Sequence, residues 1–178
     1  MPQAKNIIKS KQADIPTVGI ESLVVGSELA FRDFMSEIFA AAATMQTLRR
    51  ITAKPFGLTS TELAVILAVA KLKSDPNVRR IADHLHISAS NVTADVGKLV
   101  RRRLLRKLSD PEDARAIKIT LTEKGSSLIT AMTPALRAVN DRIFSNMSRD
   151  EMATITSRLK LVVSEGGRLI EEAAARDR

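Results

Sequence analysis

Apolar residues recur at three- and four-residue steps along residues 28–53, a spacing typical of one face of an amphipathic helix. The positions of this stripe are Phe31, Phe34, Met35, Ile38, Phe39, Ala42, Met45 and Leu48. The stripe is wider than the first helix of one small domain needs, so we expect part of it to face a second subunit. Pro55 and Gly57 are expected to end the helix.

Three shorter helical segments follow, two of which begin at clear capping residues. The capping-box sequence over residues 59–62 predicts a helix that runs to about Leu72. After a turn that contains proline, the pattern predicts a short helix over 78–84. Ser88 follows a tight turn and can cap a further helix over 89–102. The last two segments together are typical of a helix-turn-helix.

The hydrophobic period then changes from helical to alternating. Residues 104–108 and 116–121 read as two short strands. Between them, residues 109–114 carry the Ser, Asp and Pro that favour turns. A strand, a loop and a strand directly after a helix-turn-helix predict a hairpin wing.

Two long helices are expected after the wing. The first is predicted over about 123–147, with Pro134 as a possible kink. The second opens with a capping box over 148–151. Its apolar stripe consists of Met152, Ile155, Leu159, Val162, Val163, Leu169 and Ile170.

The expected fold class is therefore mainly α with a small β-hairpin wing: a winged helix-turn-helix plus long dimerisation helices. We expect residues 1–27 to form a partly disordered N-terminal arm and residues 28–172 to form one domain. Within that domain the DNA-binding lobe is placed at about 58–122. The dimerisation helices are placed at about 28–53 and 123–172, because outer helices with apolar stripes commonly pack against a symmetry mate.

The chain is basic, and most of its net charge lies in one segment. The formal net charge is +8, and the 13 basic and 7 acidic residues from Lys71 to Lys124 supply +6 of it. Such a field suits a surface that meets phosphates, although a solvated basic face without a partner has the same composition. Aromatic residues make up only 3%, with no Trp or Tyr, which disfavours the stacking surfaces of single-strand binders.

Several other classes of protein are disfavoured. The absence of cysteine excludes disulfides and thiol redox sensing. His84 and His86 cannot share one helical face, so we expect no metal site. Without a phosphate-binding glycine loop or a nucleophile elbow, we expect neither catalysis nor a cofactor. The uncharged, largely apolar run over 38–48 is too short to cross a bilayer, and we expect a cytoplasmic protein associated with the nucleoid and no membrane partner.

The predicted recognition helix has side chains suited to double-stranded DNA at both ends. Short hydrogen-bonding side chains lie near its start, where such helices enter the major groove. They are Ser88, Ser90, Asn91 and Thr93. Asn can pair bidentately with adenine, and Ser88 can act both as a helix cap and as a DNA contact. Lys98 and Arg101, followed by two more arginines, are suited to phosphates, where they fix register without reading sequence.

Residues 58–125 resemble the MarR family of winged helix-turn-helix regulators. The motifs that carry the resemblance are Gly57-Leu58-Thr59, Ile81-Ala82-Asp83-His84-Leu85, Ser88-Ala89-Ser90-Asn91-Val92-Thr93, Asp110-Pro111-Glu112-Asp113-Ala114-Arg115 and Leu121-Thr122-Glu123-Lys124-Gly125. The resemblance implies that Arg115 enters the minor groove from the wing and that Asp113 holds the wing by an ion pair. A guanidinium suits the negative potential of a narrow minor groove.

Two positions depart from the family pattern. Where the family usually has Gly after the recognition helix, this chain has Arg103, which must accept a left-handed conformation unless the helix ends differently. Gly97 stands where the family usually has a larger polar residue, and a mid-helix Gly costs ~1 kcal/mol against Ala. Either a close packing contact or a close approach to the DNA backbone would explain it.

Regulators of this family are often released from DNA by small ligands, and the resemblance therefore implies an effector. In this chain the pocket would be formed by Met45, Arg49, Arg50 and Met132. Arginine beside flexible methionines suits an aromatic acid or an acyl thioester. The plainer interpretation is that the methionines are core residues and the arginines are solvated.

These observations predict a sequence-specific, ligand-responsive repressor that binds a palindromic operator as a homodimer. Two alternatives stay open. One is a nonspecific architectural DNA-binding protein, which would show a steep salt dependence and little sequence preference. The other is a winged-helix protein-interaction module, which the basic recognition segment disfavours.

Overall fold

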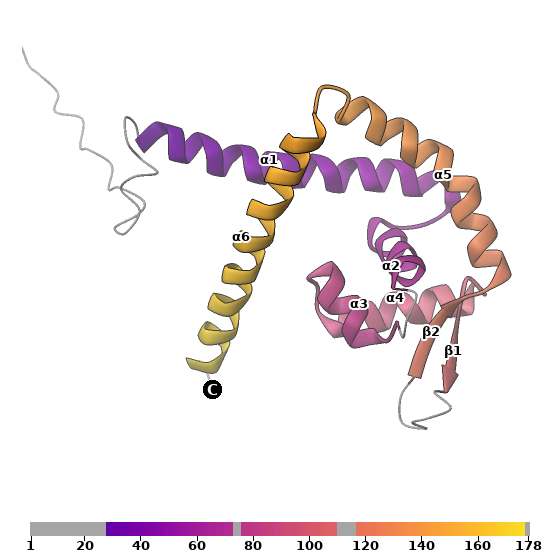
Figure 1. Ribbon diagram of the computed structural model, residues 1–178. Helices are drawn as coiled ribbons and strands as arrows, with labels where there is room; N and C mark the ends of the chain where they lie inside the picture. The colour runs from indigo at the N-terminus through magenta and orange to yellow at the C-terminus, as the bar shows by residue number, and fades with distance from the viewer. Residues whose placement is uncertain (1–27, 73–75, 110–116, 177–178) are drawn as a thin grey trace, which may run out of the picture. The chain divides into compact units, whose positions relative to one another are not determined.

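The computed structural model describes residues 28–72, 76–109 and 117–176 (Figure 1). By compactness the chain divides into two units, Met1–Leu63 and Ala64–Arg178. The predicted N-terminal arm and the tip of the wing lie outside the described residues. The predicted fold class is confirmed, because the described residues form six α-helices, one 3₁₀ turn and a two-stranded antiparallel hairpin.

The described part of the first unit consists mainly of one long helix. Helix α1 spans Glu28–Ala53, as the apolar stripe predicted. A 3₁₀ turn, η2 (Lys54–Phe56), contains the proline expected to end α1. Gly57 then adopts a left-handed conformation with φ 65°, and its N–H donates to the carbonyl of Lys54 at 3.0 Å. This turn ends the first helix and lets the chain start the next one.

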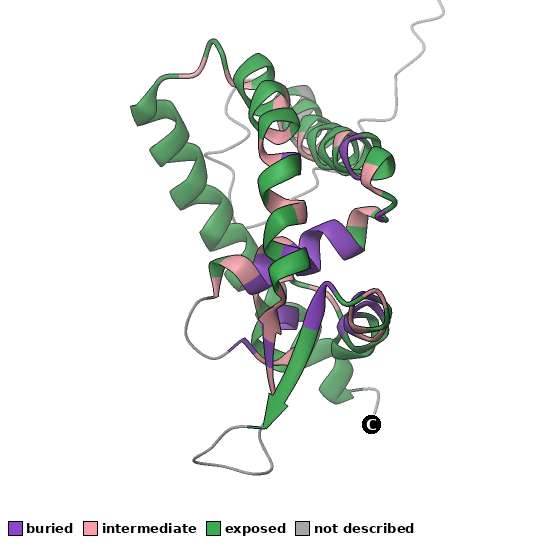
Figure 2. Ribbon diagram, turned by 90° about the vertical axis from the view of Figure 1, so that its right-hand side faces the viewer, coloured by how far each residue is buried: buried purple, intermediate pink, exposed green. Residues whose placement is uncertain are grey.

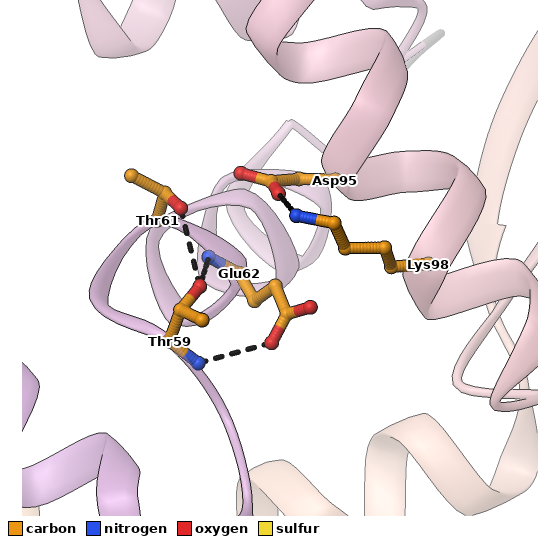
Figure 3. A network of polar contacts seen from close by, with 5 residues as sticks. All are labelled: Thr59, Thr61, Glu62, Asp95 and Lys98. Atoms are coloured by element: carbon orange, nitrogen blue, oxygen red, sulfur yellow. Dashed lines mark hydrogen bonds and ion pairs between the residues drawn. The ribbon is translucent and has the colours of Figure 1, made fainter.

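Helix α2 (Ser60–Lys71) begins at the predicted capping box. The Thr59 N–H donates to the Glu62 carboxylate at 3.0 Å, and the Glu62 N–H donates to the Thr59 hydroxyl at 3.1 Å (Figure 3). The helix is apolar on nearly every side, which is typical of a helix buried all round. Its buried apolar residues are Leu63, Ala64, Val65, Ile66, Ala68 and Val69.

The helix-turn-helix lies in the second unit. Helix α3 (Val78–Leu85) is capped by Asn77, whose side chain accepts from the Arg80 N–H at 2.9 Å. Helix α4 (Ala89–Arg101) is capped by Ser88, and the two helices pack on each other. The buried faces of the pair are purple in Figure 2 and contain Ile81, Ala82, Val92, Val96 and Leu99.

Strands β1 (Leu105–Ser109) and β2 (Ile117–Leu121) form the wing. They pair antiparallel, with Leu105 opposite Leu121 and Ser109 opposite Ile117. On its other edge β2 is held by one bond, from the Ile119 N–H to the Pro76 carbonyl at 2.7 Å. Ile119 is fully buried, whereas Ile117, nearer the tip, is 51% exposed, so only the base of the hairpin joins the core.

A close backbone contact joins the end of the recognition helix to the start of helix α5 (Glu123–Ile143). The Thr122 hydroxyl donates to the Arg103 carbonyl at 2.7 Å and also accepts from the Gly125 N–H as the N-cap of α5. A Cβ added at Gly125 would lie 2.1 Å from the Leu104 carbonyl oxygen. Glycine is required here because the two backbones approach too closely for any side chain.

Helix α5 continues through Pro134 but ends four residues before the predicted boundary, since Phe144 caps it and a turn follows. Helix α6 (Arg149–Arg176) begins at the predicted capping box, where the Glu151 carboxylate accepts from Ser148. These hydrogen bonds lower the pKa of Glu151 because they stabilise the charged carboxylate. No described residue of α6 is buried.

We predict that Gly125→Ala destabilises the protein by about 2 kcal/mol or more, because the new methyl group overlaps the Leu104 carbonyl. Gly167→Ala is the matched control, since a Cβ at that position of α6 meets nothing within 4 Å. The control should gain up to ~1 kcal/mol from helix propensity. Urea denaturation measures both, and equal stabilities of the two variants would contradict the contact.

Candidate nucleic-acid interface

The start of α4 presents short polar side chains to solvent, as predicted. Ser88, Ser90, Asn91 and Thr93 are all exposed. The Ser88 hydroxyl accepts from the Asn91 N–H at 3.3 Å and lies 3.0 Å from the Ser90 hydroxyl. The Thr93 hydroxyl donates to the Ala89 carbonyl at 2.8 Å. Ser88 and Thr93 therefore have structural partners within the helix.

Asn91 is placed differently from its neighbours. Its backbone N–H donates to the capping hydroxyl of Ser88, but its side-chain amide has no hydrogen bond within the described part of the chain. An exposed amide offers one acceptor and two donors, which is the set that pairs bidentately with adenine. Of the polar residues at this end, Asn91 has the side chain best suited to reading a base.

The other end of α4 carries the predicted cations together with an acid that sequence analysis missed. The Lys98 ammonium lies 2.9 Å from the Asp95 carboxylate (Figure 3). The Asp95 side chain is only 7% exposed, whereas that of Lys98 is 48% exposed. Asp95 occupies the interior position between Val92 and Leu99, and a charge on that apolar stripe was the signal that could have identified it.

Gly97 lies on α4 without a tight neighbour. A Cβ added there would lie 3.6 Å from Arg101 Nη1, which is an ordinary distance to the end of a flexible side chain. The first explanation for this glycine, a close packing contact, is therefore wrong for the described part of the chain. Close approach of the DNA backbone is the explanation that stays a prediction.

The recognition helix ends in a left-handed residue that is not glycine. Arg103 has φ 58° and is exposed. Arg103 therefore accepts the left-handed conformation, and the helix ends in the same way as a helix with glycine at this position. The carbonyl groups around it are held by Thr122 and by the Lys124 ammonium, which donates to the Arg102 carbonyl at 3.2 Å.

The wing adds positive charge beside this helix end. Arg106 and Lys107 on β1 are exposed, and the Arg106 guanidinium donates to the Thr120 hydroxyl across the hairpin at 3.1 Å. Asp113 and Arg115, the predicted wing-tip residues, lie outside the described residues. Their roles stay predictions.

The predicted effector residues are placed on two helices. Met45 is 37% exposed on α1, and Arg49 and Arg50 on the same helix are also exposed. Met132 on α5 is fully buried. Met132 is thus a core residue, and the two arginines are solvated, as in the plainer interpretation. A pocket shared by the four residues stays a prediction.

In the part of the chain that the structure describes, no single helix is long and apolar enough to cross a membrane, and one bent pair meets that test only when its two parts are combined.

The order of helices and the hairpin define a winged helix-turn-helix protein, and comparison with known proteins identifies its family. A model of the MarR family matches residues 56–116. The transcriptional regulator MhqR of Bacillus subtilis is 33% identical over 106 residues, which cover 60% of this chain and 72% of MhqR. The chain belongs to the MarR family of DNA-binding transcriptional regulators.

Solved structures of MarR-type regulators share the fold. CouR of Rhodococcus jostii, crystallised with p-coumaroyl-CoA, has a TM-score of 0.66 at 20% identity, covering 74% of this chain and 92% of CouR. MepR of S. aureus, solved as a DNA complex, has a TM-score of 0.61 at 19% identity, covering 72% of this chain and 92% of MepR.

We predict that Gly97→Ala raises the free energy of unfolding by up to ~1 kcal/mol, because alanine favours the helix and its methyl group has room. The same substitution should weaken DNA binding, since the methyl group would keep the helix from the DNA backbone. Thermal melting and a fluorescence-anisotropy titration with duplex DNA measure the two effects. Unchanged DNA affinity would refute the close approach.

Proposed function

We propose that this protein is a ligand-responsive repressor that binds a palindromic operator as a homodimer. The observation that carries the proposal is the recognition helix, which exposes the Asn91 amide at its start and cations at its end. The adjoining wing, from the same unit, extends the basic surface with Arg106 and Lys107.

The homodimer is supported by the last helix. Helix α6 is 28 residues long and has no buried residue among those described. Most of its exposed apolar side chains recur at helical spacing: Met152, Ile155, Leu159, Val162, Val163, Leu169 and Ile170, with Leu161 exposed beside them. A helix owes most of its stability in a protein to packing of its apolar face, so this stripe needs a partner. A second copy of the chain is the proposed partner. Helix α1, where Phe39 is 67% exposed, is proposed as a dimerisation helix as well.

The proposed domain organisation follows. Residues 28–172 form one regulatory domain, with the DNA-binding lobe at about 58–122 and dimerisation helices at about 28–53 and 123–172. Residues 1–27 form an N-terminal arm. In a two-fold dimer the two recognition helices would lie about one turn of DNA apart, roughly 10 bp, and would read an inverted repeat.

Each DNA-facing residue has a proposed role. Ser90 and Asn91 contact base edges in the major groove. Ser88 and Thr93 also contact DNA there, in addition to their hydrogen bonds within the helix. Phosphate contacts are assigned to Lys98 and Arg101. From the wing, Arg115 enters the minor groove, and Asp113 holds the wing by an ion pair.

The proposed effector is an aromatic acid or an acyl thioester. Its pocket would be formed by Met45, Arg49, Arg50 and Met132. CouR supports this choice, because it was solved with p-coumaroyl-CoA, a compound of the acyl-thioester class. The protein would act in the bacterial cytoplasm, associated with the nucleoid through its DNA.

Selection of bound duplexes from a random pool tests the proposal. Enrichment of one inverted repeat with half-sites about 10 bp apart is expected, and addition of an aromatic acid or its thioester should release it. Binding that falls steeply with salt but enriches no sequence would instead identify a nonspecific architectural protein.

We predict that Arg115→Ala weakens operator binding about tenfold or more, because the wing loses its minor-groove cation. The dimer and its melting temperature should stay as in the unchanged protein, since the role proposed for Arg115 is a contact with DNA. Gel shift, sedimentation and thermal melting measure the three quantities. Operator affinity equal to that of the unchanged chain would exclude this role for the wing.

We predict that Asn91→Ala relaxes the base preference at one symmetric position of each half-site, at a cost of about 1–3 kcal/mol for the preferred base. The measurement is a titration against operators that carry each base at every position. Uniform weakening on all duplexes would assign Asn91 to the DNA backbone instead.

A further inference from the structure

Arg103 holds a strained backbone conformation. It is one of two non-glycine residues with positive φ in the described part of the chain; His86 is the other. The Arg103 N–H donates to the Val100 carbonyl at 2.9 Å, and the Leu104 N–H donates to the Leu99 carbonyl at 2.9 Å. This pair of bonds is the Schellman ending of a helix, and the left-handed residue within it is usually glycine. A residue with a Cβ is strained there, because the Cβ lies too close to the following carbonyl oxygen.

The fold needs the backbone of this residue but not its side chain. The Arg103 carbonyl accepts from the Thr122 hydroxyl, and the preceding carbonyl of Arg102 accepts from the Lys124 ammonium. Glycine would support the same bonds without strain. Among the residues that the structure describes, the exposed Arg103 guanidinium has no hydrogen bond or ion pair. The described part of the fold therefore does not explain why an arginine stands here.

The position of Arg103 supplies a reason. Helix α4 has 13 residues and is therefore about 20 Å long, whereas the major groove is ~12 Å wide. When the start of the helix reads bases, its end lies at the phosphates that border the groove. Of the cations at this end, Lys98 also pairs with Asp95, and Lys124 is bound to a carbonyl. The exposed Arg101 and Arg103 have no hydrogen bond or ion pair among the described residues, so both can meet an external anion.

We propose that Arg103 is a phosphate anchor of the DNA interface, kept in a strained conformation because its guanidinium binds a backbone phosphate beside the recognition helix. A guanidinium can donate two parallel hydrogen bonds to one phosphate. Strained residues that the fold over-determines are concentrated at functional sites. The proposal rests on the proposed function, since it requires α4 to be the helix that lies on DNA.

The test is Arg103→Gly, a variant expected to change stability and DNA binding in opposite directions. Relief of the left-handed strain should keep the melting temperature at or above that of the unchanged protein. Operator affinity should fall about tenfold. The slope of log K against log salt concentration should become shallower by ~0.9, the value for one phosphate contact. Base preference should not change, because phosphate contacts carry no sequence information.

Two controls separate this contact from other effects. Arg103→Lys keeps the charge and the strain, and it should keep the salt slope. Arg142→Gln removes one exposed charge from α5, and it should leave the salt slope unchanged if the contact is local to Arg103.

Two results would overturn the proposal. The first is an Arg103→Gly variant that binds the operator with the affinity and salt slope of the unchanged protein. The second is a variant that melts well below the unchanged protein, because the side chain would then serve the fold. Failure of the proposed function is distinguishable, since the unchanged protein itself would then prefer no operator.

Discussion

The carbonyl group of Leu104 is the point on which the DNA-facing part of the molecule depends. The recognition helix ends beside it, the first strand of the wing starts after it, and Gly125 of α5 lies against it with no room for a methyl group. The Thr122 hydroxyl, which caps α5, also donates to the adjacent Arg103 carbonyl. This contact between residues 103–104 and 122–125 therefore links the recognition helix, the wing and α5.

Through this contact, the proposed effector could change the position of the DNA-binding elements. Because α5 starts within the contact, we expect a change in its direction to move the end of α4 and the base of the wing together. The base of the wing is fixed on its other edge by the bond from Ile119 to Pro76, so the hairpin follows the helix pair. A ligand that binds one arrangement of α5 better than another would thus change the spacing of the two recognition helices in the proposed dimer.

Much of this architecture could be predicted from local sequence signals, and the remainder depends on contacts between distant residues. The caps at Thr59, Ser88 and Ser148 and the alternating strands gave element positions within a few residues, because these signals act over one helical turn. At Arg103 two helix endings stayed open from the sequence, and the bond from Thr122 to the Arg103 carbonyl joins residues 19 positions apart, beyond the reach of local signals. Asp95 received no role from the sequence, although its place on the apolar stripe of α4 was a local signal. The wing-tip roles came from family resemblance alone.

We propose that the recognition helix α4 and the wing contact DNA as one rigid unit, and that a symmetric dimer carries two such units. A footprint of the full chain on a selected operator tests it most directly, with methylation protection for the major groove and hydroxyl radicals for the minor groove. The account predicts two protected major-groove segments about 10 bp apart, each flanked by a protected minor groove. Protection of a single half-site, or of major grooves without their flanking minor grooves, would contradict it.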